Sequence, residues 1–160
     1  MNEDSDSPLR RFRPTRRAVV VGGGALIVGA GVPGAMAAKP LSPAILKATG
    51  GAIPKEGRIK IDIPRISESG NSVAMGIVVD SPMTTADHVK SIDIVAPRNP
   101  FPNVARFHIG PRAGRAKVST NIRLALTQDV YAVAAMSDGS FWMAHQEVLV
   151  TIAACIDGGM

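Results

Sequence analysis

The single cysteine of this chain, Cys155, is the residue best suited to covalent chemistry. It lies five residues from the C-terminal Met160, directly after a segment whose pattern predicts the last strand of a β domain. An accessible thiolate attacks sulfur electrophiles and is attacked by them. A thiol carried on a short tail beyond a folded domain could therefore reach the active site of another protein.

The tail around this thiol, which we call the arm, covers residues 153–160. It contains Ala153, Ala154, Cys155, Ile156, Asp157, Gly158 and Gly159. Free cysteine is often a small buried hydrophobe, and that is the alternative interpretation of Cys155. The terminal position and the polar, glycine-rich residues behind the thiol favour an accessible sulfur instead.

The N-terminal residues 1–37 predict an exported protein. Arg16 and Arg17 end a basic region, Ala18 to Val32 is an apolar run, and Ala35-Met36-Ala37 fits a small-residue cleavage site. An uncleaved membrane anchor is the alternative, but the apolar run is shorter than the roughly 20 residues that a span needs. The paired arginines favour the twin-arginine route and hence the bacterial periplasm, although chance adjacency in a basic region is the alternative. Cysteines in such a compartment are usually paired, and Cys155 has no partner in its own chain.

Charge and length limit the classes of function. The formal charge of the chain is +5, and it falls to +3 when residues 1–37 are removed, because 13 Lys and Arg then face 10 Asp and Glu. The mature part has no basic run interleaved with aromatic residues, so nucleic-acid binding has little support. Its 123 residues suit one domain over 38–152, followed by the arm.

One short helix is predicted within Pro40 to Gly50. Ser42 is a suitable N-cap, Pro43 suits the first helical position, and Gly50-Gly51 would stop the helix. Its apolar residues share one face, which we expect to pack on the domain, with docking on a partner as the alternative.

The rest of the mature chain predicts seven or eight short strands separated by turns. Asp138-Gly139 is a hairpin signal, because that pair tolerates positive φ at both turn positions, and Glu68 to Asn71 is a turn. Val73 to Val79 is almost continuously apolar, which predicts a central strand covered on both faces. The expected fold is all-β, an antiparallel sandwich, and the predicted strands are Arg58–Ile63, Val73–Val79, His88–Ala96, Val104–Ile109, Lys117–Leu124, Val130–Ala135, Ser140–Ala144 and Glu147–Ile152.

Other chemistry has weaker support. A copper site would need a histidine soon after the cysteine, and none follows. The scattered His88, His108 and His145 are more typical of surface or structural residues, so we expect no metal and no cofactor. A cysteine so close to the chain end is poorly placed for a rigid catalytic pair. We interpret four methionines as core or interface residues, and six aspartates as mostly turn or strand-end residues: Met75, Met83, Met136 and Met143, and Asp62, Asp80, Asp87, Asp93, Asp129 and Asp138.

A series of short motifs runs through the mature chain in a fixed order. They are Gly57-Arg58-Ile59-Lys60-Ile61-Asp62-Ile63-Pro64, Gly70-Asn71-Ser72-Val73, Val79-Asp80-Ser81-Pro82-Met83-Thr84, Asp87-His88-Val89-Lys90, Asn99-Pro100, Val104-Ala105-Arg106-Phe107, Val118-Ser119-Thr120, Ile122-Arg123-Leu124 and Met136-Ser137-Asp138-Gly139-Ser140-Phe141. Together they resemble the SoxY family, the carrier subunits of the sulfur-oxidising Sox system.

The resemblance implies an immunoglobulin-like sandwich that is exported by the twin-arginine route and paired with a second sandwich subunit, SoxZ. It also implies that Cys155 holds a sulfur substrate covalently on a swinging arm. In this family a haem c enzyme attaches thiosulfate or another reduced sulfur species, and other periplasmic enzymes process the adduct. The carrier itself catalyses nothing.

The arm departs from the family pattern Gly-Gly-Cys-Gly-Gly. Ala153 and Ala154 have fewer backbone states than glycines, which should stiffen the arm before the thiol. Ile156 adds bulk, and Asp157 adds a negative charge that disfavours the thiolate and repels an anionic substrate. The chain is most similar to a SoxY-related group whose arm reads Ala-Ala-Cys-Ile-acid. Two functions therefore remain open: a sulfur carrier, or a non-catalytic assembly module whose cysteine forms an intermolecular disulfide or packs at an interface.

Overall fold

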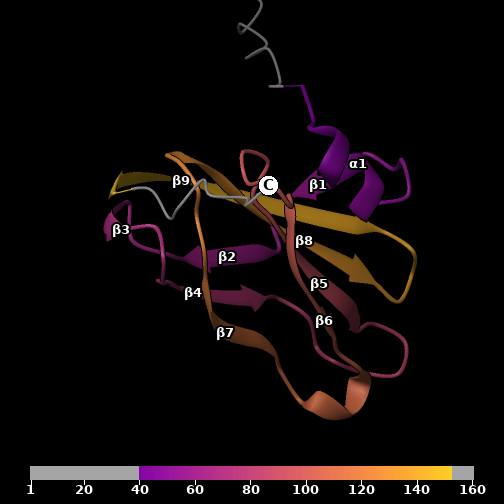
Figure 1. The fold of residues 1–160 in the computed structure, drawn as a ribbon. Helices are drawn as coiled ribbons and strands as arrows, with labels where there is room; N and C mark the ends of the chain where they lie inside the picture. Colours follow the sequence, from indigo (N-terminus) through magenta and orange to yellow (C-terminus); the bar gives the residue numbers. More distant parts are fainter. Residues whose placement is uncertain (1–39, 153–160) are drawn as a thin grey trace, which may run out of the picture. The chain divides into compact units, whose positions relative to one another are not determined.

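A computed structural model describes residues 40–152, so the predicted signal segment and the arm lie outside the described residues. Within 40–152, no helix is long and apolar enough to cross a membrane. Figure 1 shows the elements in chain order: α1 (Pro43–Ala48), β1 (Lys55–Glu56), β2 (Ile59–Asp62), β3 (Ile66–Ser69), β4 (Val73–Val79), β5 (Val89–Val95), β6 (Asn103–His108), a 3₁₀ turn (Pro111–Ala113), β7 (Ala116–Ile122), β8 (Gln128–Met136) and β9 (Phe141–Ile152).

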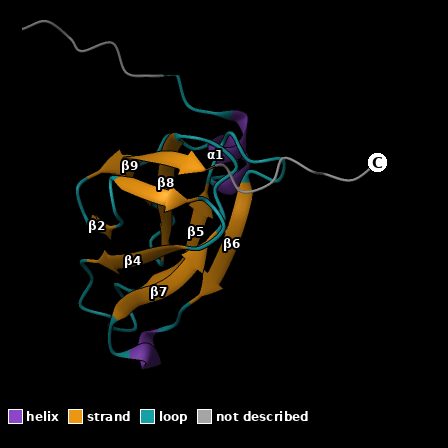
Figure 2. Cartoon of the chain, turned by 60° about the vertical axis from the view of Figure 1, so that its left-hand side comes forward, coloured by secondary structure: helices purple, strands orange, loops and turns teal. Residues whose placement is uncertain are grey.

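The strands form two sheets, which confirms the predicted sandwich. The larger sheet has the order β1-β9-β8-β5-β6, and β3 also pairs with β9; the smaller sheet has the order β2-β4-β7. Figure 2 shows β8 and β9 on one side and β4 and β7 on the other. Most pairings are antiparallel, whereas the short strands β1 and β3 run parallel to β9.

Apolar side chains fill two separate layers. The main core lies between the sheets and contains Ile77, Ile92 and Val130, all fully buried. A second cluster lies under α1, where Ile45 packs with Val95, Tyr131, Val133 and Met143. Burial of apolar side chains from water is the main force that holds such layers together.

The predicted helix is confirmed, and it packs on its own domain. Ser42 caps it, since the Ser42 hydroxyl accepts a hydrogen bond from the Ile45 N–H at 3.4 Å, and Pro43 is the first helical residue. Gly50 and Gly51 follow the helix at φ of 63° and 91°, a region that strongly favours glycine. The sequence therefore specifies both ends of α1 locally.

The predicted hairpin joins β8 and β9, but its turn differs from the expectation. Only Gly139 has a positive φ, of 83°, and the loop covers Ser137 to Ser140. Asp138 instead accepts hydrogen bonds from the Ser140 N–H and hydroxyl at 2.8 and 2.7 Å. Such a side-chain turn replaces the tight two-residue turn that the Asp-Gly pair predicted.

The expectation that both faces of Val73–Val79 are covered is wrong. Burial alternates along β4, and Val78 is 44% exposed on the outer face. Ala74 and Gly76 on that face are apolar by type but small, so the composition concealed a half-exposed strand. The doubly covered strand is β8, which has the second sheet on one side and α1 on the other.

Strand β9 is one continuous element of 12 residues rather than two strands. His145, which lies where the break was expected, stacks on Tyr131 of β8 with ring centroids 5.3 Å apart. The sequence also missed β1 and β3, and it placed a turn over the end of β3. Both short strands depend on pairing with β9, which their local sequence does not reveal.

The α1 packing predicts a clear contrast between two neighbouring residues. Ile45→Ala should lower the free energy of unfolding by about 2–5 kcal/mol, because it leaves a cavity in the cluster beneath the helix. Leu46→Ala is the control, since Leu46 is 37% exposed, and it should cost much less. Urea denaturation of both variants measures the difference, and equal losses would contradict the packing of α1 on the sheet.

Candidate functional site: the root of the arm

The described chain ends where the arm begins, at the C-terminal end of β9. On one side, β3 pairs with this end through Ile66↔Leu149, Ser67↔Val150 and Ser69↔Ile152. The Gly70 N–H donates to the Ile152 carbonyl at 2.9 Å, and the Thr151 hydroxyl donates to the Ser67 carbonyl at 3.2 Å. The last described residue is thus tied into the sheet.

On the other side, a side chain takes over where the main-chain ladder stops. The register between β8 and β9 ends at Gln128↔Val148. Beyond it, the Val150 N–H donates to the Thr127 hydroxyl at 2.9 Å. The Thr127 hydroxyl therefore replaces the main-chain acceptor that a longer β8 would offer to the Val150 N–H.

Gly70 links this root to the opposite sheet. Its carbonyl accepts a hydrogen bond from the Leu124 N–H at 2.8 Å, just after β7, while its own N–H is bonded to Ile152. Gly70 is buried, so both of its main-chain groups need such partners. The point from which the arm departs is therefore fixed relative to both layers of the sandwich.

The surface at the root is apolar. Leu149 is 50% exposed, and the neighbouring Ile66 and the terminal Ile152 are each 67% exposed. Ile66 lies directly opposite Leu149 in the parallel pairing. Ile66 and Leu149 thus share one face of the sheet, whereas Ile152, three residues after Leu149, belongs to the other face. A scattered exposed apolar residue needs no explanation, but an exposed apolar pair beside a chain end favours a contact surface.

The residues predicted to carry the chemistry, Cys155 and its arm neighbours, lie outside the described residues, as do Arg16 and Arg17. Cys155 follows Ile152 by three residues. Three residues span at most about 11 Å. The thiol is therefore confined to the neighbourhood of the root by covalent geometry alone.

The histidines occupy separate structural positions within 40–152, as expected. His88 Nδ1 lies 3.1 Å from the Thr84 carbonyl, His145 stacks on Tyr131, and His108 is exposed on β6. No group of three His, Cys, Asp or Glu residues that could hold a metal ion occurs in this part of the chain.

The methionine interpretation is confirmed, since Met75, Met83, Met136 and Met143 are all at most 8% exposed. Among the acids, Asp93 differs from the others because it is buried within β5 and pairs with Arg106 of β6.

Sequence reasoning missed the residues that hold the root in place, chiefly Gly70 and Thr127. Ile66-Ser67-Glu68-Ser69 has only one apolar residue and so no alternation that would indicate a strand. A single threonine before a strand carries no pattern of its own.

Comparison with known proteins agrees with the fold. The family model described as sulfur oxidation protein SoxY matches residues 45–155, a range whose last residue is Cys155. The chain belongs to the SoxY family. The solved sulfur carrier protein SoxY from Chlorobium limicola f thiosulfatophilum is 32% identical, with a TM-score of 0.56, over 68% of this chain and 94% of that one.

More distant structures share only the fold. The superoxide reductase (neelaredoxin) from Ignicoccus hospitalis is 19% identical over 59% of this chain and 80% of that chain, with a TM-score of 0.52. A single-residue variant of the same reductase gives a TM-score of 0.53 at 20% identity, over 69% and 88% of the two chains. Comparison with curated protein sequences found no match.

The Thr127 contact at the root of this SoxY-family protein predicts a local effect on exchange. Thr127→Val keeps the side-chain shape but removes the hydroxyl that accepts from Val150, so the Val150 amide should exchange with solvent roughly tenfold faster. Thr85→Val, at an exposed loop position, is the matched control. Amide exchange followed by NMR measures both, and an unchanged Val150 rate would refute the anchoring role of Thr127.

Proposed function

We propose that this protein is a periplasmic sulfur carrier that holds a sulfur-compound intermediate covalently on Cys155. The observation that carries the proposal is the family match, which extends to Cys155. The only thiol of the chain thus falls three residues beyond a strand end that is bonded on both sides.

The anchored root supports a carrier in a specific physical way. A carrier must present its cargo repeatedly at one place and orientation, which requires a fixed point of departure and a short tether. Hydrogen bonds from Gly70 and to Thr127 provide the fixed point. The three-residue separation keeps the Cα atom of Cys155 within about 11 Å of the Ile152 Cα atom.

By family resemblance, the cargo is thiosulfate or a related reduced sulfur compound. Joining the Cys155 thiol to thiosulfate forms a new S–S bond and releases one proton and two electrons. A haem c protein is the class of partner that accepts these electrons. Later steps on the adduct belong to other periplasmic enzymes, because the carrier contributes only attachment and presentation.

A SoxZ-like β-sandwich subunit is the proposed partner at the root. The exposed apolar pair Ile66 and Leu149 lies on one face of the sheet, close to the point where the arm leaves it. A subunit packed there would cover this surface and help to direct the arm toward one side. The Arg16-Arg17 pair supports delivery of the folded protein to the periplasm.

The altered arm supports a modified version of this function. Alanines before Cys155 and Ile156-Asp157 after it replace the glycines of the family pattern. A stiffer and more acidic arm would suit a loading enzyme whose entrance is wider and less negative than one that admits a glycine-flanked thiol. The same departure favours the second candidate, a non-catalytic assembly module in which Cys155 forms an intermolecular disulfide or packs at an interface.

Replacement of the thiol separates the two candidates. Cys155→Ser should abolish a reductant-sensitive mass increment on periplasmic protein from cells grown with reduced sulfur, and should abolish the pathway, while partner binding remains. Ala153→Ser places the same hydroxyl on the arm and should keep the increment. Intact-protein mass spectrometry provides the measurement. A wild-type protein that is always a free thiol, or always a protein-protein disulfide, would contradict the carrier.

The charge beside the thiol predicts a selective effect on its reactivity. Asp157→Asn removes a negative charge two residues from Cys155, so the reaction with an anionic aromatic disulfide should speed up about threefold to tenfold at low ionic strength. The reaction with neutral iodoacetamide should change less, and added salt should reduce the difference. Stopped-flow absorbance follows both reactions. Equal acceleration with both reagents would show that Asp157 does not act through repulsion of anions.

A further inference from the structure

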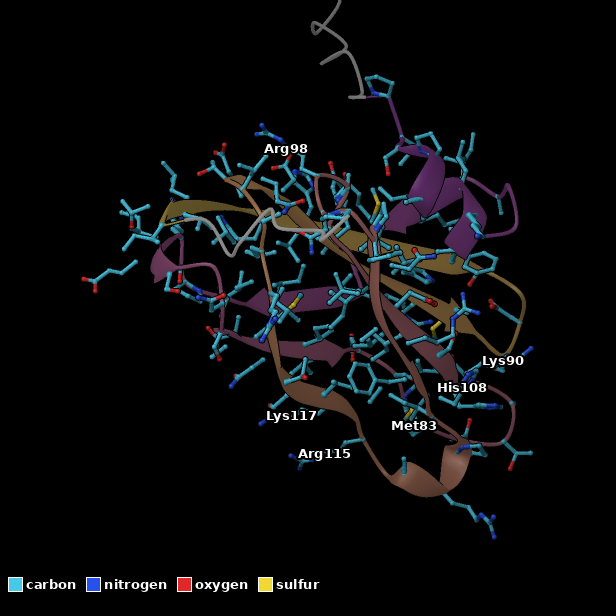
Figure 3. All side chains as sticks on the ribbon, in the orientation of Figure 1. Met83, Lys90, Arg98, His108, Arg115 and Lys117 are labelled. Carbon is cyan, nitrogen blue, oxygen red and sulfur yellow. The ribbon has the colours of Figure 1, made fainter. Side chains whose placement is uncertain are left out.

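The outer face of the β2–β4–β7 sheet carries a basic surface that the carrier function does not use. In the register of these strands, Lys60 lies beside Val78, and Val78 lies beside Lys117. All three are exposed. Because adjacent strands are about 4.8 Å apart, the two lysines lie about 10 Å apart on either side of an exposed apolar side chain. In Figure 3 the side chains of Arg115 and Lys117 extend away from the ribbon at this edge.

These residues line an open groove of about 750 Å³. Its lining contains four cations, Arg58, Lys60, Arg115 and Lys117, and one acid, Asp80. Arg58 is paired with Asp87 at 2.9 Å, and its hydrogen bond to Asp87 is the main reason why the pKa of Arg58 is raised. Within residues 40–152, no ion pair engages Lys60, Arg115 or Lys117, so the groove keeps a positive charge.

Trp142 forms a fixed apolar side of the groove. Its indole N–H donates to the Ser140 hydroxyl at 3.2 Å, and that hydroxyl donates to Asp138. These bonds from Ser140 lower the pKa of Asp138 and so favour its carboxylate form. Lys55 and Arg58 lie over the ring at 5.9 and 5.5 Å.

Gly57 allows the chain to pass close to this ring. A Cβ at Gly57 would come within 3.3 Å of the indole, and the residue has a φ of +135°. A side chain at this position would therefore be strained and would push against Trp142. The close approach helps to hold the indole at the edge of the groove.

The same face continues as a surface of small side chains. Gly76 is the next residue to Val78 on this face of β4, and Ser119 is paired with it on β7. Ala74 and Asn121 form the next pair along the strands. On β2, however, Asp62 is paired with Gly76. This end of the face therefore carries a carboxylate, and the basic surface is confined to the end that carries Lys60 and Lys117.

We propose that this basic groove docks an acidic segment of a partner protein. The three cations outside any ion pair outnumber the one acid of the lining, Asp80, and this surplus attracts a segment rich in Asp and Glu. Val78 and Trp142 provide apolar contact beside them. The groove is open and its cations are spread over about 10 Å, which fits a chain segment better than a single small anion.

The position of the groove distinguishes it from the arm. Trp142 and Ile152 lie near opposite ends of β9, ten residues apart, or roughly 33 Å along the strand. The Cα atom of Cys155 lies within about 11 Å of the Ile152 Cα atom, and one side chain adds too little for the thiol to reach the groove of its own molecule. The inference therefore does not depend on the chemistry of Cys155, and a partner held at the groove leaves the arm free.

Trp142 gives a direct readout because it is the only tryptophan in the chain. The probe is a synthetic ten-residue peptide of alternating glutamate and glycine, titrated into the folded protein while Trp142 fluorescence is followed. We expect a saturable change whose midpoint weakens roughly tenfold between about 0.05 and 0.3 M salt. The same peptide with glutamine in place of glutamate should give no saturable change.

Two matched double variants remove equal charge from different places. Lys60→Gln with Lys117→Gln should weaken peptide binding at least about fivefold. Lys47→Gln with Lys90→Gln should leave binding unchanged, because these exposed lysines lie on α1 and β5; Figure 3 shows Lys90 well away from Lys117. Circular dichroism confirms that both variants are folded.

Three outcomes would overturn the proposal. The first is a glutamine peptide that binds as well as the acidic one, and the second is an equal loss in both double variants. The third is a response to inorganic sulfate that matches the peptide at equal total charge, which would identify a small-anion site instead. Each outcome is independent of whether Cys155 carries a sulfur compound.

Discussion

Pairing on both edges of β9 is the constraint on which the rest of the structure depends. The strand bonds to β8 on one side and to β1 and β3 on the other. A strand without a partner on one edge would expose a row of unpaired main-chain groups. On the edge opposite β8, β1 pairs with the start of β9 and β3 with its end, so Phe141 to Ile152 forms a single support whose two ends carry different surfaces.

The two ends of β9 support different kinds of contact. Near its start, Trp142 borders a groove with a surplus of positive charge. At its end, Ile152 is bonded to Gly70 beside exposed apolar side chains. Charged surfaces speed and orient encounter between proteins, whereas apolar surfaces contribute more to stable association. The proposed partners thus differ by location: an acidic segment at the groove and a sandwich subunit at the root.

Local sequence predicted most of the elements because their signals are local. Ser42, Pro43 and Gly50 define α1 by capping and backbone preference, and the alternation in Ile59, Lys60 and Ile61 defines β2. The prediction failed where a distant element decides the outcome. The cover over β8 comes from α1, and the outer face of β4 has none, so two apolar segments of similar composition have different exposure.

The candidate site also combines features that local sequence indicates with features that depend on distant residues. The hypotheses of an arm thiol and of an export signal come from the sequence alone, because a lone cysteine on a tail and a twin-arginine segment are local patterns; both stay predictions, since they lie outside the described residues. The anchor of the arm could not, since it depends on Gly70, Thr127 and a short parallel strand that meets β9 far along the chain. The basic groove likewise needs the register of three strands to bring Lys60 and Lys117 together.

The most direct test of the central claim is the alkylation rate of Cys155 by iodoacetamide in the folded protein and in concentrated urea. A thiol presented by an anchored strand end should react in the folded state within about tenfold of its rate in urea. Protection by roughly 100-fold or more in the folded state would show a sulfur enclosed in the protein interior. That result would contradict a carrier that offers its thiol to other proteins.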